Sequence, residues 1–319
     1  MYAFAVAVRR LLPVLLLACA LPPAHAAQLR VDTLRLDAPG VDDAPLRVRV
    51  YRFDDARRRD VLYANDGQDM EAVGLEATLR GLDAEGVALP IVVAIDMPRD
   101  RMGAYGLSDP AQARSVVADT KYGPVGARAQ AYSEWLAHAL VPWIDAHYRT
   151  RRSRRGRAVV GWSLGALNAF NLGWNYPHLF ATVGAFSPSF WLSAERGDAA
   201  AVQCTRLAQR MVEAGPRHRT RWWIAVGDHE ETDDRDGDGL ADAIDDARDV
   251  ALALQSGGDS ANLDWARRPD RSARVAFALV AGGEHNQAAW KRMLPAFLRW
   301  TYGREPLPAP SPLAETPAP

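Results

Sequence analysis

A serine flanked by glycines is the first candidate for chemistry in this sequence. Gly161-Trp162-Ser163-Leu164-Gly165 has the spacing G-x-S-x-G, follows an apolar run at 158–161 and opens a helical pattern at 164–174. Between a strand and a helix, this spacing produces a tight turn that exposes the serine hydroxyl, and the glycines avoid clashes with neighbouring backbone. The pattern favours Ser163 as a nucleophile over the alternative, a plain turn that happens to contain serine.

A serine hydroxyl needs an adjacent base to attack a carbonyl near neutral pH. Among the seven histidines, His285 stands out because Gly282-Gly283-Glu284-His285 directly follows the last apolar strand candidate, at 275–280. In the chain order serine, acid, histidine, the base belongs on the loop after that strand. We therefore predict that His285 is the base, and a purely structural histidine is the alternative.

The acid that orients such a histidine should follow a strand between Ser163 and His285. The apolar run at 222–226 leads into Gly227-Asp228-His229-Glu230-Glu231. Asp228, Glu230 and Glu231 all qualify by position, and either type of carboxylate can hold the imidazole in the required tautomer. The residue types alone leave these three open.

Two main-chain N–H groups should stabilise the negative charge that develops on the carbonyl oxygen. One donor is expected from Leu164, directly after the nucleophile. The other is expected from the loop Asn65-Asp66-Gly67-Gln68, which follows the third strand candidate.

The elements that must position these residues alternate between apolar runs and helical patterns. The strand candidates are Leu29–Leu36, Leu46–Phe53, Val61–Asn65, Ile91–Ile95, Ala158–Gly161, Thr182–Phe186, Trp222–Val226 and Val275–Val280. The helix candidates are 132–148, kinked at Pro142, then 164–174, 199–212, 241–254 and 287–302. The first two strands alternate in polarity whereas the later ones are continuously apolar. This pattern predicts one α/β domain with a mostly parallel eight-stranded sheet, an antiparallel N-terminal edge and helices on both faces.

Several motifs resemble one known family. They are VLYANDGQ, GWSLGALNAF followed by YPHLF, AFSPSFW, GDHE and GGEHNQAAW, spread from Tyr51 to Trp300. They are similar to the esterase family of α/β-hydrolases that includes enterochelin esterases, esterase D, feruloyl esterases and mycolyltransferases. The resemblance implies the α/β-hydrolase fold, Ser163 and His285 as nucleophile and base, Glu230 as the acid, and the backbone of Gln68 as the second oxyanion donor.

Residues and resemblance together predict a serine carboxylic-ester hydrolase that acts on a small-molecule ester and needs no cofactor for catalysis. The alternatives are an acyltransferase with the same machinery and a catalytically inactive binding module of the same fold. The net charge of -1 gives no indication of a nucleic-acid partner. Trp162, Trp191 and Trp290 could line an aromatic pocket or pack in the core, and the long loop at 99–126 is expected to overlie the site.

An aspartate-rich segment at 233–245 departs from the family pattern. Its spacing resembles a calcium loop of the EF-hand type, in which alternate carboxylates converge on the ion and glycine permits the turn. The candidate ligands are Asp234, Asp236, Asp238, Asp242 and Asp245. A bound Ca²⁺ would be structural, since the serine mechanism needs no metal, and a solvated acidic loop is the alternative.

Both ends of the chain differ in composition from the domain at 27–304. Residues 1–26 have a positive start, an apolar run at 11–21 and the small-residue pattern Ala24-His25-Ala26, typical of an export signal. We therefore expect a periplasmic or secreted protein, with a lipoprotein attached through Cys19 as the alternative, and no transmembrane segment in the mature chain. Residues 305–319 are rich in proline and alanine and are predicted to form a disordered tail.

Overall fold

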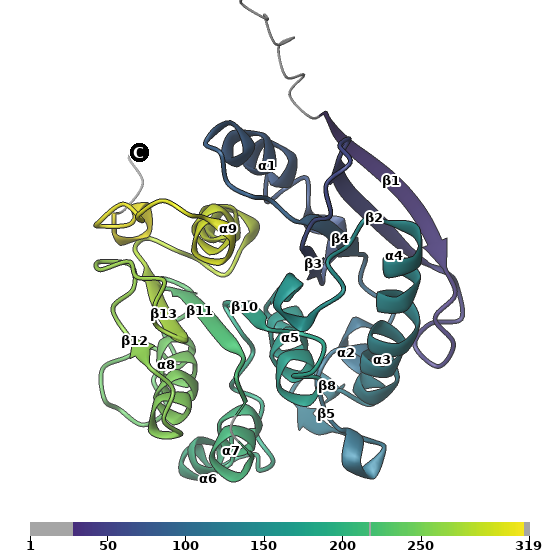
Figure 1. Ribbon diagram of the computed structural model, residues 1–319. Coiled ribbons are helices and arrows are strands. Elements are labelled where there is room, and N and C mark those ends of the chain that lie inside the picture. Colours follow the sequence, from purple (N-terminus) through teal and green to yellow (C-terminus); the bar gives the residue numbers. More distant parts are fainter. Residues whose placement is uncertain (1–27, 217, 316–319) are drawn as a thin grey trace, which may run out of the picture.

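The computed structural model describes residues 28–216 and 218–315, and one nine-stranded sheet runs through it (Figure 1). In spatial order the strands are β1 (Leu29–Leu36), β2 (Leu46–Phe53), β4 (Ile91–Ile95), β3 (Val61–Ala64), β9 (Arg157–Trp162), β10 (Thr182–Phe186), β11 (Arg221–Gly227), β13 (Val275–Val280) and β12 (Ala261–Asn262). β2 pairs antiparallel with β1 and β4, and every other neighbouring pair is parallel. The predicted fold class is confirmed. The sheet has one strand more than expected, because the two-residue β12 is too short to leave a pattern in the sequence.

Helices cover both faces of the sheet because its central strands are apolar on both sides (Figure 1). Val159 packs in the core of one face, whereas Ala158 and Val160 pack in the core of the other. The first core includes α3 (Ala129–Trp135), α4 (Val141–His147), α5 (Leu164–Asn175), α7 (Leu207–Ala214) and α8 (Asp242–Ser256), and the second includes α1 (Leu75–Ala84) and α9 (Gln287–Tyr302).

Two predicted helices are less regular than their patterns suggested. The irregularity in the first is a π-helical turn at Leu136–Leu140, just before Pro142 in the first turn of α4. Proline has no N–H to donate to the preceding turn, and this favours a wider turn ahead of it. The predicted helix at 199–212 is two helices, α6 (Ala199–Cys204) and α7. Between them the buried Arg206 turns inward to bind Asp246 and Asp249.

The segment at 99–126 forms a small subdomain instead of an open loop. It contains α2 (Arg101–Ala104) and two hairpins, β5 (Leu107–Asp109) with β6 (Arg114–Val116) and β7 (Ala118–Thr120) with β8 (Gly123–Val125). Short 3₁₀ turns lie at Gly67–Asp69, Pro110–Gln112, Arg154–Gly156 and Pro312–Ala314.

Part of the segment predicted as a disordered tail, 305–319, packs against the domain. Leu313 is 1% exposed, and its carbonyl accepts a hydrogen bond from Ala281 N–H directly after β13. The proline-rich composition hid this contact, because a single docked leucine creates no periodicity. The predicted signal peptide and Cys19 lie outside the described residues. Within those residues, no helix combines the length and apolar character needed to span a membrane.

Candidate active site

Ser163 lies in the sharp turn between β9 and α5, with a φ of 55° that L-residues rarely adopt. The two flanking glycines explain how the chain tolerates this turn. A Cβ at Gly161 would lie 2.2 Å from the carbonyl oxygen of Gly165, and a Cβ at Gly165 would lie 2.3 Å from Asp66 Oδ2. Both positions therefore require glycine, which is the physical reason for the G-x-S-x-G spacing.

The Ser163 side chain lines a cavity of about 680 Å³, which Leu164, Glu230 and His285 also line. Its Oγ is 3.5 Å from Ser189 Oγ, and across the described residues no direct hydrogen bond joins Ser163 to His285. In enzymes without a bound substrate such a bond is often long, and it tightens when substrate binds.

His285 is paired with Glu230, which is one of the three carboxylates left open by position. Nδ1 of His285 is 3.0 Å from Glu230 Oε2, and the Glu230 side chain is only 3% exposed. The other carboxylate oxygen, Oε1, accepts from Gly227 N–H at 2.6 Å and from Ser187 Oγ at 2.5 Å. The three donors satisfy a carboxylate that burial would otherwise destabilise.

Ser187 and Trp290 support this pair, and sequence reasoning assigned neither of them that role. The indole N–H of Trp290 donates to Ser187 Oγ at 2.9 Å, so the serine hydroxyl is free to donate its own proton to Glu230. The Trp290 ring also packs edge-on against His285, with ring centroids 5.6 Å apart. The available signal was the motif SPSFW, whose first residue is Ser187.

The two other acid candidates have different surroundings. Asp228 Oδ1 lies 2.5 Å from Nδ1 of its neighbour His229. Glu231 lines the cavity, and partial burial together with repulsion from Asp242 and Asp233 raises its pKa. Neither residue hydrogen-bonds the predicted base.

The predicted oxyanion donors come from two loops that are bound together. Leu164 is the first residue of α5, so its N–H has no acceptor within the helix. Asn65 Nδ2 donates to the carbonyl of Gly165 at 2.8 Å, which holds the loop after β3 against the first turn of α5. Gln68 lies in that loop but is not among the residues that line the cavity, and its side-chain oxygen accepts from Met97 N–H.

A salt bridge behind the serine turn stabilises the same region. Asp66, 0% exposed, accepts from Nε of Arg101 at 2.7 Å and from Nη2 at 2.8 Å. Nη2 of Arg101 also reaches the carbonyl of Trp162, directly before Ser163. The small subdomain at 99–126 is thereby attached to both loops of the site.

The walls of the cavity combine aromatic and charged side chains. The subdomain at 99–126 contributes Lys121 and Tyr122, so it does overlie the site as expected, and Trp191 and Arg196 follow β10. Trp162 and Trp290 are buried and stacked on each other, with centroids 5.4 Å apart. Of the three tryptophans considered as pocket residues, Trp191 alone lines the cavity.

The four central residues follow the carboxyl ends of neighbouring parallel strands: Ser163 follows β9, Ser187 β10, Glu230 β11 and His285 β13. Open α/β sheets commonly bind their ligands at this edge. A model of the "Putative esterase" family matches residues 43–301. The chain belongs to that family.

Individual relatives are more distant. The uncharacterized protein YjcH of Bacillus subtilis (strain 168) is 37% identical over 67 residues, which cover 21% of this chain and 28% of that protein. A ferulic acid esterase structure superimposes with a TM-score of 0.62 at 16% identity, covering 86% of this chain and 98% of its own. The enterochelin esterase of Shigella flexneri gives a TM-score of 0.59 at 15% identity, covering 84% of this chain and 58% of its own. At these identities the structural matches establish the fold.

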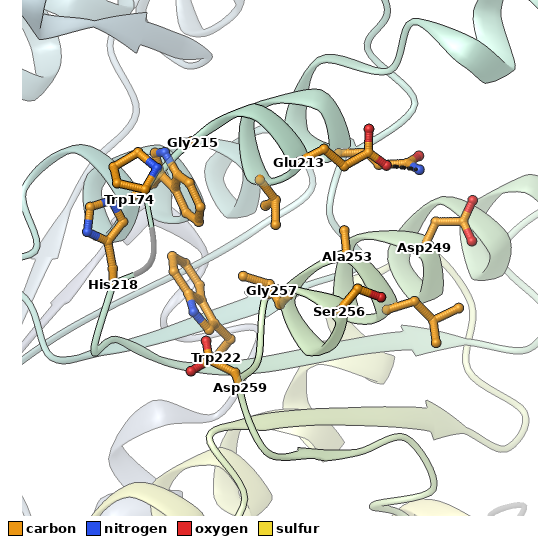
Figure 2. A pocket seen from close by; sticks show the side chains of 15 residues that line it. Trp174, Glu213, Gly215, His218, Trp222, Asp249, Ala253, Ser256, Gly257 and Asp259 are labelled. Atoms are coloured by element: carbon orange, nitrogen blue, oxygen red, sulfur yellow. Dashed lines mark hydrogen bonds between the residues drawn. The ribbon is translucent and has the colours of Figure 1, made fainter.

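A second cavity, of about 480 Å³, lies between α7 and α8 (Figure 2). Trp174, His218 and Trp222 line one side of it, and Glu213 and Asp249 lie on the helices. No predicted site residue lines it, so the candidate chemistry belongs to the larger cavity at the carboxyl edge.

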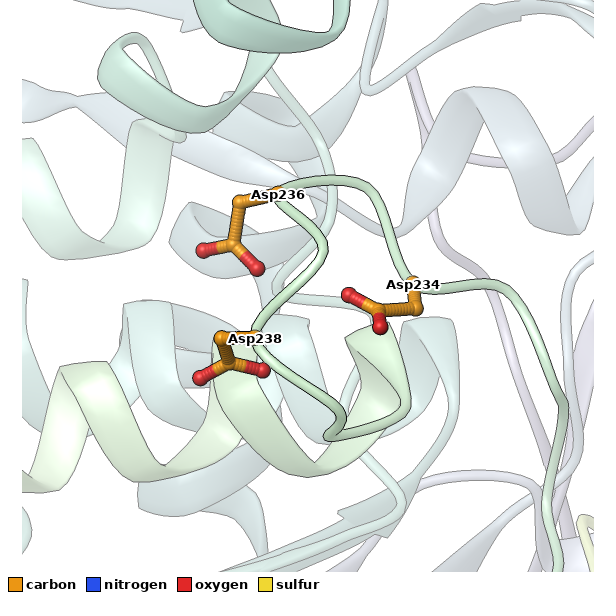
Figure 3. A group of neighbouring side chains, drawn as sticks. All are labelled: Asp234, Asp236 and Asp238. Carbon is orange, nitrogen blue, oxygen red and sulfur yellow. The ribbon is translucent and has the colours of Figure 1, made fainter.

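The aspartate-rich loop brings three of its five predicted metal ligands together (Figure 3). Carboxylate oxygens of Asp234, Asp236 and Asp238 all lie within 4.8 Å of one another on the surface. The other two predicted ligands, Asp242 and Asp245, lie in the first turn of α8 and are not part of this group. Asp242 pairs with Arg235, and Asp245 accepts from Gln203. Both carboxylates stay close to the loop, since Asp242 Oδ1 accepts from Arg235 N–H and Asp245 shares the Gln203 amide with Asp236.

Proposed function

We propose that this protein hydrolyses carboxylic esters of small molecules through an acyl-enzyme formed on Ser163. The observation that carries the proposal is the hydrogen bond that His285 donates to the buried Glu230 carboxylate, beside a cavity that is also lined by a serine in a strained strand–helix turn. Membership of the esterase family supports the same chemistry. A carboxylate, a histidine and a serine in this relation can activate the serine as a nucleophile.

In the first half-reaction, the base acts through the nitrogen that does not face Glu230. Because Nδ1 of His285 donates to the carboxylate, Nε2 is left to accept the Ser163 proton. Oγ then forms a bond to the substrate carbonyl carbon, and the carbonyl oxygen becomes negative. When the carbon–oxygen bond to the alcohol breaks, His285 returns the proton to the departing oxygen, and the acyl group stays on Ser163.

In the second half-reaction, water replaces the alcohol. His285 takes a proton from the water while the water oxygen attacks the acyl carbon. His285 then returns that proton to Ser163 Oγ as the acid leaves. The N–H groups of Leu164 and Gln68 are the proposed donors to the negative oxygen in both halves. Such donors act most strongly where the charge develops in the transition state.

Covalent labelling with a fluorophosphonate tests the proposal directly. We expect one adduct, located on the peptide that contains Ser163, with loss of p-nitrophenyl acetate hydrolysis. Ser163→Ala should abolish both labelling and turnover. Ser193→Ala is the matched control, because this serine lines the same cavity but donates to Glu195 O, and it should label normally. Labelling that persists in Ser163→Ala would overturn the assignment, and ester formation with added alcohols in place of free acid would favour acyl transfer.

We propose further that the protein is exported, on the basis of the residues at 1–26 alone. The mature protein recovered from a bacterial host should begin near Ala27. Intact mass measurement tests this, and a chain that keeps Met1 or carries lipid on Cys19 would contradict it.

We also propose that the three converging aspartates bind Ca²⁺ as a structural ion. The chemistry of the donors supports this, because Ca²⁺ prefers carboxylate oxygens in a flexible arrangement. The loop begins three residues after Glu230, so an ion there would restrain the loop that carries the proposed acid.

A further inference from the structure

The edge of the sheet opposite to Ser163 carries a cavity of about 410 Å³. It is lined by residues that begin the parallel strands, namely Arg157 of β9, Thr182 of β10 and Arg221 of β11. Ser163 and Glu230 follow the other ends of β9 and β11. The cavity is therefore separate from the candidate active site, with the length of the strands between them.

Positive charge dominates this cavity. Asp60 is the one carboxylate among its lining residues, against six guanidinium groups, and it already pairs with Arg151. Within the described chain, two of the six have a carboxylate partner, since Arg157 pairs with Asp145 and Arg274 with Asp259. The four that have none are Arg154, Arg155, Arg219 and Arg221.

Contacts with neutral groups hold two of these guanidinium groups in place without neutralising them. Arg154 Nε donates to Pro177 O at 2.6 Å, and Arg221 lies 3.9 Å above the ring of Trp300. Burial and neighbouring arginines lower the pKa of Arg154 and of Arg221. The folded protein therefore keeps like charges together at this edge, where they repel one another.

Two buried hydroxyl groups also lack a partner in this cavity. Thr301 Oγ1 and the phenol of Tyr302 both belong to lining residues, and across the described chain neither has a hydrogen-bond partner. Tyr302 is 9% exposed. Because buried polar groups are almost always hydrogen-bonded, two unpaired donors beside four uncompensated cations indicate a site for an oxygen-rich anion.

We propose that this cavity binds a compound that carries several linked phosphates, as a diphosphate or triphosphate group. The planar guanidinium group matches the spacing of phosphate oxygens and binds them through two parallel hydrogen bonds. The space equals roughly a dozen water molecules at about 30 Å³ each, which is more than a single phosphate displaces. Several phosphate groups would engage the four cations together and accept from the two hydroxyls.

Calorimetric titration of the whole protein with inorganic tripolyphosphate, at low ionic strength, tests the proposal. We expect saturable binding at one site, weakened by added salt because the partners are charged. Changing Arg155→Glu together with Arg219→Glu should weaken binding at least about tenfold. Both side chains are exposed, and among the described residues neither makes a side-chain hydrogen bond or a salt bridge. The matched control is Arg248→Glu, which reverses the charge of an exposed side chain on α8 outside the cavity. This variant should bind like the unaltered protein.

Three results would overturn the proposal. The first is the absence of saturable binding at millimolar tripolyphosphate, and the second is unchanged affinity in the double variant. The third is binding to phosphatidylglycerol vesicles, but not to phosphatidylcholine vesicles or soluble tripolyphosphate, which would assign the arginines to a lipid surface. Turnover of p-nitrophenyl acetate should be the same in all variants, so it reports on folding independently of the anion site.

Discussion

Glu230→Gln tests the acid of the proposed triad because it keeps the size of the side chain and changes only one atom. In the unaltered protein Oε1 accepts from Gly227 N–H and Ser187 Oγ, and Oε2 accepts from His285 Nδ1. If glutamine keeps its oxygen toward Gly227 and Ser187, its amide NH₂ faces Nδ1. His285 must then carry its proton on Nε2, where it cannot accept one from Ser163. The opposite orientation sets the amide donor against the N–H of Gly227.

The expected loss follows from this tautomer and from the missing partner for the imidazolium. In serine proteases, changing the aspartate of the triad to asparagine lowers kcat by about 10⁴-fold. Since Glu230 has additional fixed donors that preserve its position, we expect a loss of at least about a hundredfold, which corresponds to about 2.7 kcal/mol of transition-state stabilisation. The measurement is steady-state hydrolysis of p-nitrophenyl acetate, with thermal unfolding to show that the variant is folded.

Asp228→Asn and Glu231→Gln are the matched controls, since each removes a neighbouring carboxylate by the same chemistry. Both should cost much less than Glu230→Gln, because Asp228 contacts His229 and Glu231 does not contact His285. If Asp228→Asn were the most damaging of the three, or Glu230→Gln kept near-normal turnover, the assignment of the acid would be refuted.

Three more outcomes are expected. Trp290→Phe removes the N–H that orients Ser187 and should lower kcat about fivefold, the value of one hydrogen bond, with little change in KM; an unchanged kcat would count against a positioning role. Calcium should raise the melting temperature, and Asp236→Ala with Asp238→Ala should abolish that rise, whereas no rise at millimolar calcium would leave an acidic loop without an ion. Glu231→Gln should stabilise the protein at pH 7 but not near pH 4. Folding raises the pKa of Glu231, so its charged form lowers the stability of the folded protein at pH 7. This cost disappears at low pH, where Glu231 is protonated in the folded and in the unfolded state. An equal effect of the substitution at both pH values would contradict this reasoning.

Much of the fold could be predicted because buried parallel strands require uninterrupted apolar residues. The strands at Thr182–Phe186 and Val275–Val280 begin and end where their apolar runs do. The turn at Ser163 was equally readable, since the contact that excludes a side chain at Gly161 is with Gly165, inside the same pentapeptide. Where the physical cause is local, the sequence carries the signal.

Features that depend on distant contacts could not be predicted in this way. Spacing left Asp228, Glu230 and Glu231 equivalent, and the resemblance alone singled out Glu230. The hydrogen bonds that distinguish it come from Ser187 and His285, which follow two other strands. Docking of Leu313 on the end of β13 likewise depends on a partner more than thirty residues away.

The arginine-rich edge lies between these two cases. Averaged over the chain, basic and acidic residues nearly cancel, and the net charge of -1 gives no sign of an anion site. Yet the arginines cluster directly ahead of buried strands, at 149–157 before β9, at 219–221 before β11 and at 271–274 before β13. Parallel strands all begin at the same edge of a sheet, so short basic segments far apart in the sequence must meet there once the strands pair. The position of charge relative to the strands, and not its sum, therefore predicts where an anion can bind.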